Sequence, residues 1–234
     1  MAKVKSPIIL ALDTDDLDTA KKWIETTAGS VDVYKVGLEF FLKHGAMGLR
    51  ELRTIREFEL FLDLKLHDIP NTVGGAVRSI RELQPRFLTV HASGGSSMIS
   101  AAAQAAPEIA ITAVTVLTSL DSAELIRMGI DSAPLDFAVT LARNAVLSGA
   151  RAIVCSPLEV AAIRQAVGSE VEIITPGVRP ADSTLGDQSR TMTPPEAIAA
   201  GADFLVIGRP ITSFYAQSPQ AMQERALQIL ESLT

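Results

Sequence analysis

The residues most suited to chemistry lie in the stretch LFLDLKLHDIPNT, residues 60–72. It begins as an apolar run and then places Asp63, Lys65 and Asp68 close together. An isolated charge is costly to bury, but an alternating set gives each charge an opposite neighbour. Opposite neighbours also favour the charged forms, so the aspartates stay ionised and the lysine stays protonated. The stretch therefore predicts a fixed array of opposite charges at the end of a buried strand.

The elements that must position these side chains are short apolar runs that recur along the chain. Most are continuous rather than alternating, which is typical of strands buried on both faces. Helical patterns lie between them, two of them within residues 119–149 and separated near Pro134. This alternation predicts a (β/α)8 TIM barrel forming a single domain over residues 1–234, with a doubly wound open sheet as the alternative. The runs are residues 8–12, 31–36, 59–65, 86–92, 109–117, 151–155, 171–176 and 203–208.

Polar residues cluster at the carboxyl ends of these runs, where barrel enzymes place their chemistry. Asp63 and Lys65 are two residues apart and are expected to share one face of their strand. If that face points into the barrel mouth, Lys35 can approach from the neighbouring strand. Any one of these charges could be an ordinary ion pair, but most of the runs end in a polar residue. The other polar residues at these ends are Asp13, His91, Thr118, Arg179 and Arg209.

Two segments near the end of the chain are expected to bind phosphate. TPGVRP at residues 175–180 and VIGRPIT at residues 206–212 each offer a glycine N–H and an arginine. Loops after the seventh and eighth strands are the usual phosphate site of this fold, and an arginine can hold phosphate through two hydrogen bonds. The irregular polar stretch at residues 179–196 follows the seventh strand. A loop of this length inside a compact domain is usually functional.

Composition narrows the classes of partner. The chain of 234 residues has a formal net charge of −6 and no basic run with interleaved aromatics, so we expect no nucleic-acid partner. A local site can still attract an anionic small molecule. The apolar run near the N-terminus has only five residues, too short for a signal peptide, and no run approaches the length of a membrane span. We expect a cytoplasmic protein.

Neither a metal nor a cofactor is expected. Cys155 is the only cysteine, which excludes a disulfide framework and a cysteine-based zinc site. His44 and His67 lack partners at metal-ligand spacing. Asp63 and Asp68 could in principle bind Mg²⁺, but the lysine between them would compete with the cation. The sequence has neither a dinucleotide fingerprint nor a Walker loop.

The stretch DLKLHDIPNT resembles the signature of the orotidine 5′-phosphate decarboxylase family, Asp-x-Lys-x-x-Asp followed by Ile-Pro-Asn-Thr. The similarity covers the whole chain. Relatives that act on other sugar phosphates share the Asp-x-Lys-x-x-Asp element but are not expected to carry the Pro-Gly-Val-Arg and Gly-Asp-Gln segments. The other matching motifs are ALD at 11–13, YKVG at 34–37, VHASGG at 90–95, TVLTS at 115–119, PGVRP at 176–180, GDQSR at 186–190 and IGRPIT at 207–212.

The resemblance implies a metal-free and cofactor-free homodimer that converts orotidine 5′-monophosphate to UMP in pyrimidine biosynthesis, with active sites at the subunit interface. It implies that Lys65 donates a proton to C6 of the pyrimidine and that Asp63 lies beside the departing carboxylate. Lys35 would orient Asp63 and touch the ribose. The further implied contacts are Asp13 with a ribose hydroxyl, Asp68 and Thr72 with the other subunit's site, Thr118 with the base, Gln188 with base and phosphate, and Arg179, Gly208 and Arg209 with the phosphate.

Two alternatives differ in their requirements. Another sugar-phosphate decarboxylase or aldolase of the same superfamily would be expected to need Mg²⁺, so a chelator distinguishes it. A non-catalytic nucleotide-binding protein on a decayed barrel should have lost at least one charged residue of the site. Lys35, Asp63, Lys65 and Asp68 are all present, which weighs against decay.

Overall fold

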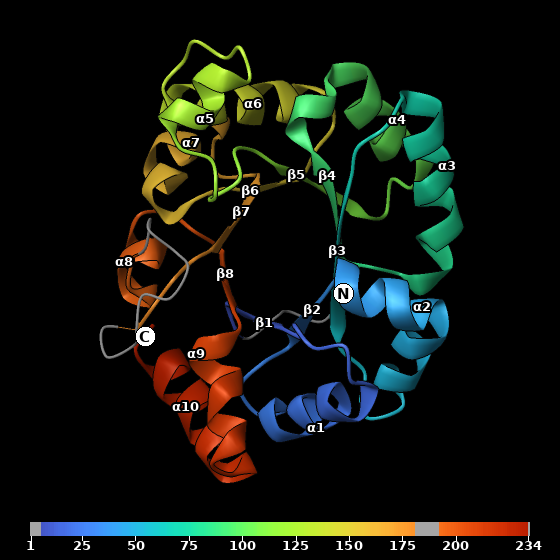
Figure 1. Cartoon of the computed structure of the whole chain (residues 1–234), viewed down its shortest axis with the longest axis vertical. Helices are drawn as coiled ribbons and strands as arrows, with labels where there is room; N and C mark the ends of the chain where they lie inside the picture. Colours follow the sequence, from blue (N-terminus) through green and yellow to red (C-terminus); the bar gives the residue numbers. More distant parts are fainter. Residues whose placement is uncertain (1–5, 181–191, 234) are drawn as a thin grey trace.

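Eight parallel strands close into a barrel in the computed structural model of the chain, which describes residues 6–180 and 192–233. Each strand pairs with the next in sequence, and β8 pairs with β1 to close the ring (Figure 1). The predicted barrel is confirmed, and the doubly wound open sheet is wrong. The strands are β1 (Ile8–Ala11), β2 (Val33–Gly37), β3 (Glu59–Leu66), β4 (Phe87–His91), β5 (Ala110–Val114), β6 (Ala152–Val154), β7 (Glu172–Pro176) and β8 (Phe204–Ile207).

Helices surround the barrel and connect successive strands (Figure 1). The two helices predicted within residues 119–149 are present, and Pro134 occupies the first position of the second. No helix in the described ranges is both long and apolar enough to cross a membrane. The α-helices are α1 (Leu17–Thr27), α2 (Leu38–Arg53), α3 (Pro70–Ile80), α4 (Ser96–Ala105), α5 (Ser122–Arg127), α6 (Pro134–Leu147), α7 (Val160–Val167), α8 (Pro194–Ala199), α9 (Arg209–Thr212) and α10 (Pro219–Glu231). The 3₁₀ helices are η1 (Arg81–Leu83), η2 (Ala92–Gly94), η3 (Pro157–Glu159) and η4 (Ser213–Ala216).

The strands are buried on both faces, which explains their continuous apolar runs. Alternate residues point to opposite sides, so one set fills the barrel interior and the other packs against the helices. Lys35 and Asp63 lie two residues beyond Val33 and Phe61 of the interior set, so their side chains project into the mouth of the barrel. The interior set is Ile9, Ala11, Val33, Phe61, Phe87, Ala110, Ala152, Ile174, Phe204 and Val206.

A bulge interrupts β3 where it borders β4. Leu62 pairs with Leu88, but the next pair joins Leu66 to Val90, so residues 63–65 of β3 lie opposite the single residue Thr89. Lys65 takes the left-handed backbone region, with φ of 48°. A residue other than glycine rarely adopts this conformation, which costs on the order of 1–3 kcal/mol. The strain thus lies at the lysine that the sequence singled out.

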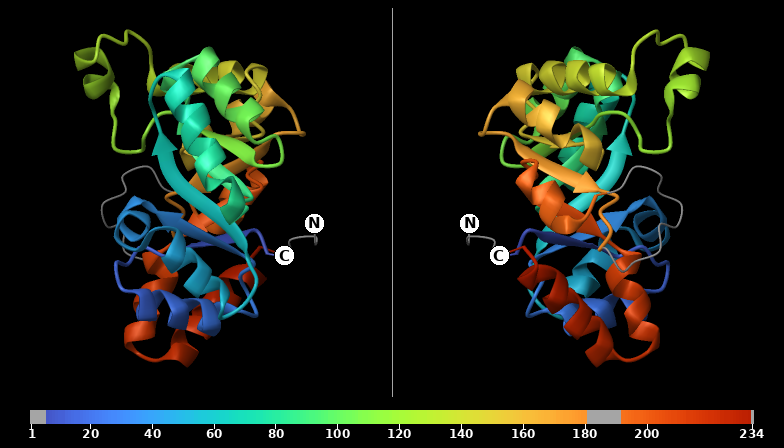
Figure 2. Two further views of the ribbon diagram at one scale, coloured as in Figure 1. Left: turned by 90° about the vertical axis from the view of Figure 1, so that its right-hand side faces the viewer. Right: turned by 90° about the vertical axis from the view of Figure 1, so that its left-hand side faces the viewer.

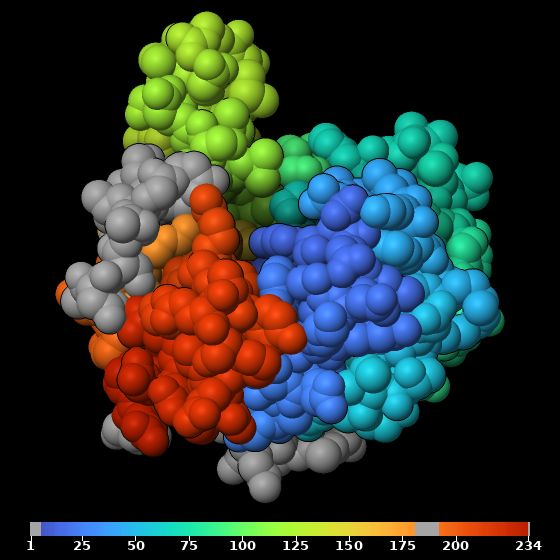
Figure 3. Space-filling model, turned by 60° about the horizontal axis from the view of Figure 1, so that its bottom comes forward, coloured from blue at the N-terminus to red at the C-terminus, as the bar shows by residue number. Residues whose placement is uncertain are grey.

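The segment that carries α5 stands apart from the barrel. In Figure 2 it projects from the body of the molecule, and Figure 3 shows the same yellow-green lobe standing above the rest of the surface. Within it, Leu125 is buried, but Ile126 and Met128 are exposed. The lobe begins shortly after Thr118, so the fold places it beside the carboxyl end of β5.

Candidate active site

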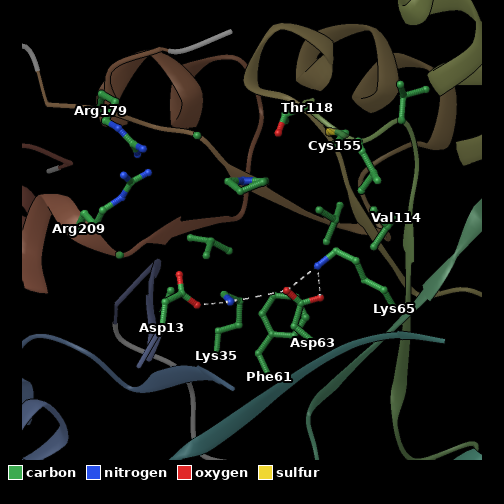
Figure 4. A pocket seen from close by; sticks show the side chains of 18 residues that line it. Asp13, Lys35, Phe61, Asp63, Lys65, Val114, Thr118, Cys155, Arg179 and Arg209 are labelled. Carbon is green, nitrogen blue, oxygen red and sulfur yellow. Dashed lines mark hydrogen bonds and ion pairs between the residues drawn. The ribbon is translucent and has the colours of Figure 1, made fainter. Parts of the chain in front are cut away.

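A cavity of about 300 Å³ opens at the carboxyl ends of the strands. This is where barrel enzymes build their active sites, and the volume suits a small ligand. The structure brings most of the predicted site residues together around it (Figure 4). They are Asp13, Lys35, Asp63, Lys65, Thr118, Arg179, Gly208 and Arg209.

The charged residues form an alternating chain along one wall of the cavity (Figure 4). Lys35 Nζ lies 2.9 Å from Asp13 Oδ1 and 3.7 Å from Asp63 Oδ2. Lys65 Nζ then donates to both carboxylate oxygens of Asp63, at 2.8 and 2.9 Å. The predicted array of opposite charges is therefore present from Asp13 to Lys65, but Asp68, which was expected to belong to it, lies outside it. Each cation has an anionic neighbour that holds it in place.

The environment of Asp63 keeps its carboxylate ionised. Burial by itself raises the pKa of Asp63, but Lys35, Lys65 and the hydroxyl of Thr89 outweigh burial and hold the pKa below its ordinary value. The pKa of His91 is also lowered, first by burial and then by the nearby His67 and Lys65. The neutral form of His91 and the ionised form of Asp63 are thus both favoured near Lys65.

The other end of the cavity is suited to an anion. Arg179 and Arg209 extend their guanidinium groups toward one another there, away from Lys65 (Figure 4). Gly177 precedes Arg179 by two residues and has a φ of 80°, a conformation that favours glycine. Arg179 N–H donates to Met192 O at 2.9 Å, which joins the residues on either side of 181–191. This end matches the predicted phosphate position.

Three predicted residues are not part of the cavity wall as described. Asp68 and Thr72 are exposed, one just past the end of β3 and the other in the first turn of α3. Asp68 Oδ1 accepts from Ile69 N–H at 2.6 Å. Gln188 lies outside the described residues, as does most of the predicted loop at 179–190. The roles of these three residues stay predictions.

Some features of the site were not foreseen from the sequence. The fifth strand ends at Val114, earlier than expected, so Thr118 reaches the cavity from a loop. Cys155 also lines the wall, where burial raises the pKa of its thiol well above the ordinary value. The hydroxyl of Thr89 contacts Asp63, but nothing in the sequence pattern distinguishes it from the other strand threonines.

The carboxylate of Asp63 is placed to bind an ammonium group rather than a metal ion. Both carboxylate oxygens of Asp63 are engaged by Lys65 Nζ, so a cation already occupies the position a metal would take. In the described part of the chain, no group of three or more His, Cys, Asp or Glu side chains could hold a metal ion.

Comparison with known proteins agrees with this geometry. Residues 6–225 match the family described as Orotidine 5'-phosphate decarboxylase / HUMPS. The chain is 56% identical over 207 residues to the orotidine 5'-phosphate decarboxylase of Thermobifida fusca, with 88% of this chain and 89% of the relative covered. It is 48% identical over 225 residues to the enzyme of that name from Frankia casuarinae, covering 89% and 82%.

A solved structure shows the same architecture. The crystal structure of orotidine 5'-phosphate decarboxylase from Lactobacillus acidophilus superposes with a TM-score of 0.81 at 34% identity, covering 97% of this chain and 99% of that one. The names of these relatives do not favour the Mg²⁺-dependent alternative. The match over nearly the whole chain shows that the protein belongs to the orotidine 5′-phosphate decarboxylase / HUMPS family.

Proposed function

We propose that the protein decarboxylates orotidine 5′-monophosphate to UMP in pyrimidine biosynthesis, without a metal or cofactor. One observation carries this proposal. Lys65 Nζ is held by Asp63 at one end of a cavity whose other end presents Arg179 and Arg209. A nucleotide with an acidic pyrimidine at one end and a phosphate at the other matches this distribution of charge.

The reaction breaks the bond between C6 and the carboxylate carbon. The electron pair stays on C6 as CO₂ leaves, and no conjugated carbonyl is available to accept it. A cation fixed beside C6 stabilises this charge without reorganising during the reaction. The Lys65 ammonium then transfers a proton to C6, giving UMP, and the neutral amine regains a proton from water. Asp63 holds the ammonium in position and lies beside the departing carboxylate.

The remaining contacts bind and orient the substrate. In this proposal Lys35 and Asp13 contact the ribose, Thr118 and Gln188 contact the base, and Gln188 also reaches the phosphate. The phosphate is held by Arg179, Gly208 and Arg209. Binding energy from the phosphate, remote from C6, can thereby be used to organise the reacting end.

A second subunit completes the site in this proposal. Asp68 and Thr72 extend from the end of β3 and the start of α3 to the partner's cavity, giving a homodimer with two shared sites. Exposed apolar residues at the start of α2 and α3 support an interface there, because Leu42 is 79% and Ile69 65% exposed. The free buried Cys155 supports a cytoplasmic location. The use of strands from Ile8 to Ile207 in one barrel supports a single domain.

The direct test is a spectrophotometric assay with orotidine 5′-monophosphate after exhaustive EDTA treatment. We expect full activity with EDTA and no stimulation by added Mg²⁺. A large loss in EDTA that Mg²⁺ restores would contradict the proposal and favour the metal-dependent sugar-phosphate enzymes of the superfamily.

A further inference from the structure

We propose that Thr89 of β4 is a positioning residue for the decarboxylation, acting through its side-chain hydroxyl on both Asp63 and Lys65. The inference rests on the proposed function for its kinetic consequence. The hydrogen bonds on which it stands are independent of the substrate.

The bulge in β3 gives Thr89 its unusual position. Residues 63–65 lie opposite Thr89 alone, whereas in a regular pair of strands three residues of β4 would lie opposite this segment. Thr89 is fully buried and follows Phe87 on the interior face of its strand. Its side chain therefore lies directly beside Asp63 and Lys65.

The hydroxyl of Thr89 connects the backbone of the lysine to the carboxylate of the aspartate. It accepts from Lys65 N–H at 2.8 Å and donates to Asp63 Oδ1 at 2.9 Å. Asp63 in turn accepts from Lys65 Nζ. The three groups close a ring of hydrogen bonds around the bulge. The backbone N–H of Lys65, displaced by the left-handed conformation of that residue, thereby gains the Thr89 hydroxyl as its acceptor.

This ring holds the Asp63 carboxylate in place and fixes Lys65 both at its backbone N–H and at its ammonium group. Without the hydroxyl, the partly buried backbone N–H of Lys65 would lose its acceptor, and the Asp63 carboxylate would lose the one neutral donor in this ring. Loss of a hydrogen bond to a charged group costs more than loss of a neutral one. We therefore expect the ammonium to sit less accurately beside C6 when the hydroxyl is absent.

The test compares wild type with Thr89→Val and compares Thr89→Ser with Thr89→Ala, so that each pair differs by the hydroxyl of residue 89. Thr89→Val removes the hydroxyl but keeps the branched shape of the wild-type side chain, and Thr89→Ser keeps the hydroxyl that Thr89→Ala lacks. The matched control is Thr112→Val on β5. Thr112 is also fully buried and lies beside Thr89 in register, but its hydroxyl donates to Ala110 O at 2.9 Å instead of to a charged group.

We expect Thr89→Val to lower kcat on the order of 10- to 100-fold, the range for one lost hydrogen bond to a charged group, with a much smaller change in KM. The kcat of Thr89→Ala should be lower than that of Thr89→Ser by a similar factor, and the kcat of Thr112→Val should stay near the wild-type value. Near-wild-type kcat in Thr89→Val, or an equal loss in Thr112→Val, would overturn the inference. If Thr89→Val does not fold, equal kcat in Thr89→Ala and Thr89→Ser would overturn it.

A titration of Asp63 by carboxyl NMR in the free protein separates this inference from the proposed function. The groups that face Asp63 are Lys35 from β2, Lys65 on its own strand, and Thr89 and His91 from β4. Removing the Thr89 donor should raise the pKa of Asp63, and Thr112→Val should leave it in place. An unchanged pKa in Thr89→Val would overturn the inference, whereas an inactive wild-type enzyme would overturn only the proposed function.

Discussion

Asp63 is the residue on which the charged array depends, because two lysines from adjacent strands share its carboxylate. Its side chain is 12% exposed, as is that of Lys35, so the pair is poorly screened by solvent. Removing one partner of a buried pair leaves an uncompensated charge and is strongly destabilising. The same groups that organise the reaction therefore contribute to the stability of the fold.

A pH dependence of stability follows from the lowered pKa of Asp63. A carboxyl whose folded pKa lies below its unfolded value contributes stability above the unfolded pKa and loses it as pH falls through the folded pKa. The ordinary value is 3.8, so the loss should occur below that pH. Asp63→Asn should lower the free energy of unfolding at neutral pH by on the order of 3–5 kcal/mol relative to wild type. Calorimetry should show that the difference in unfolding free energy between wild type and Asp63→Asn narrows below pH 3.8. A difference independent of pH would contradict the lowered pKa of Asp63.

At the scale of elements, the loops after β7 and β8 form the anion-binding end of the cavity. Arg209 begins α9 directly after Gly208, where an added Cβ would approach the Ala11 side chain at 3.4 Å. The close packing of this turn against β1 sets the guanidinium at the cavity edge. The element therefore presents the arginine to a ligand that enters the barrel mouth.

Replacing Arg209 tests the role of this element. Arg209→Ala should cost about 1.5–3 kcal/mol of transition-state stabilisation with orotidine 5′-monophosphate, as for a lost charged hydrogen bond. The loss in kcat/KM should be much smaller with orotidine, which lacks the phosphate. Arg81→Ala is the matched control, because Arg81 pairs with Glu108 on the surface outside the cavity. Equal losses on both substrates would show that Arg209 does not bind the phosphate.

The sequence predicted the strands well because burial on both faces leaves a strong apolar signal. The predicted ends of the third and seventh strands differ from the observed ones by at most one residue. The bulge at Lys65 could not be predicted, since a lysine gives no sign that it will adopt a positive φ. Strict alternation correctly placed Asp63 and Lys65 together, but it missed that Thr89 alone lies opposite them. Such a contact depends on the register between two strands, which the sequence of either strand does not reveal.

At the scale of the whole molecule, one chain supplies the charged array and the arginines, while Asp68 extends past the strand to an exposed position. A two-fold dimer requires each subunit to give what it receives. The exposed position of Asp68 accordingly allows it to serve a neighbouring cavity. Whether it does so needs a measurement on mixed subunits.

Complementation between two inactive variants makes that measurement. Lys65→Ala and Asp68→Ala are dissociated, mixed equally and reassembled. About half of the dimers are then mixed, and each has one intact site of two, so roughly a quarter of wild-type activity should return. With mixed dimers confirmed by mass spectrometry, an absence of recovery would show that Asp68 serves its own barrel.

That the ammonium of Lys65 drives decarboxylation is tested by comparing Lys65→Ala with wild type. A lost proton donor and a lost fixed charge together should lower kcat/KM for orotidine 5′-monophosphate by at least about 10⁴-fold. Binding of UMP measured by calorimetry should stay within about tenfold of wild type, because the phosphate end of the cavity is intact. A folded Lys65→Ala variant that still decarboxylates the substrate within tenfold of the wild-type rate would contradict the claim.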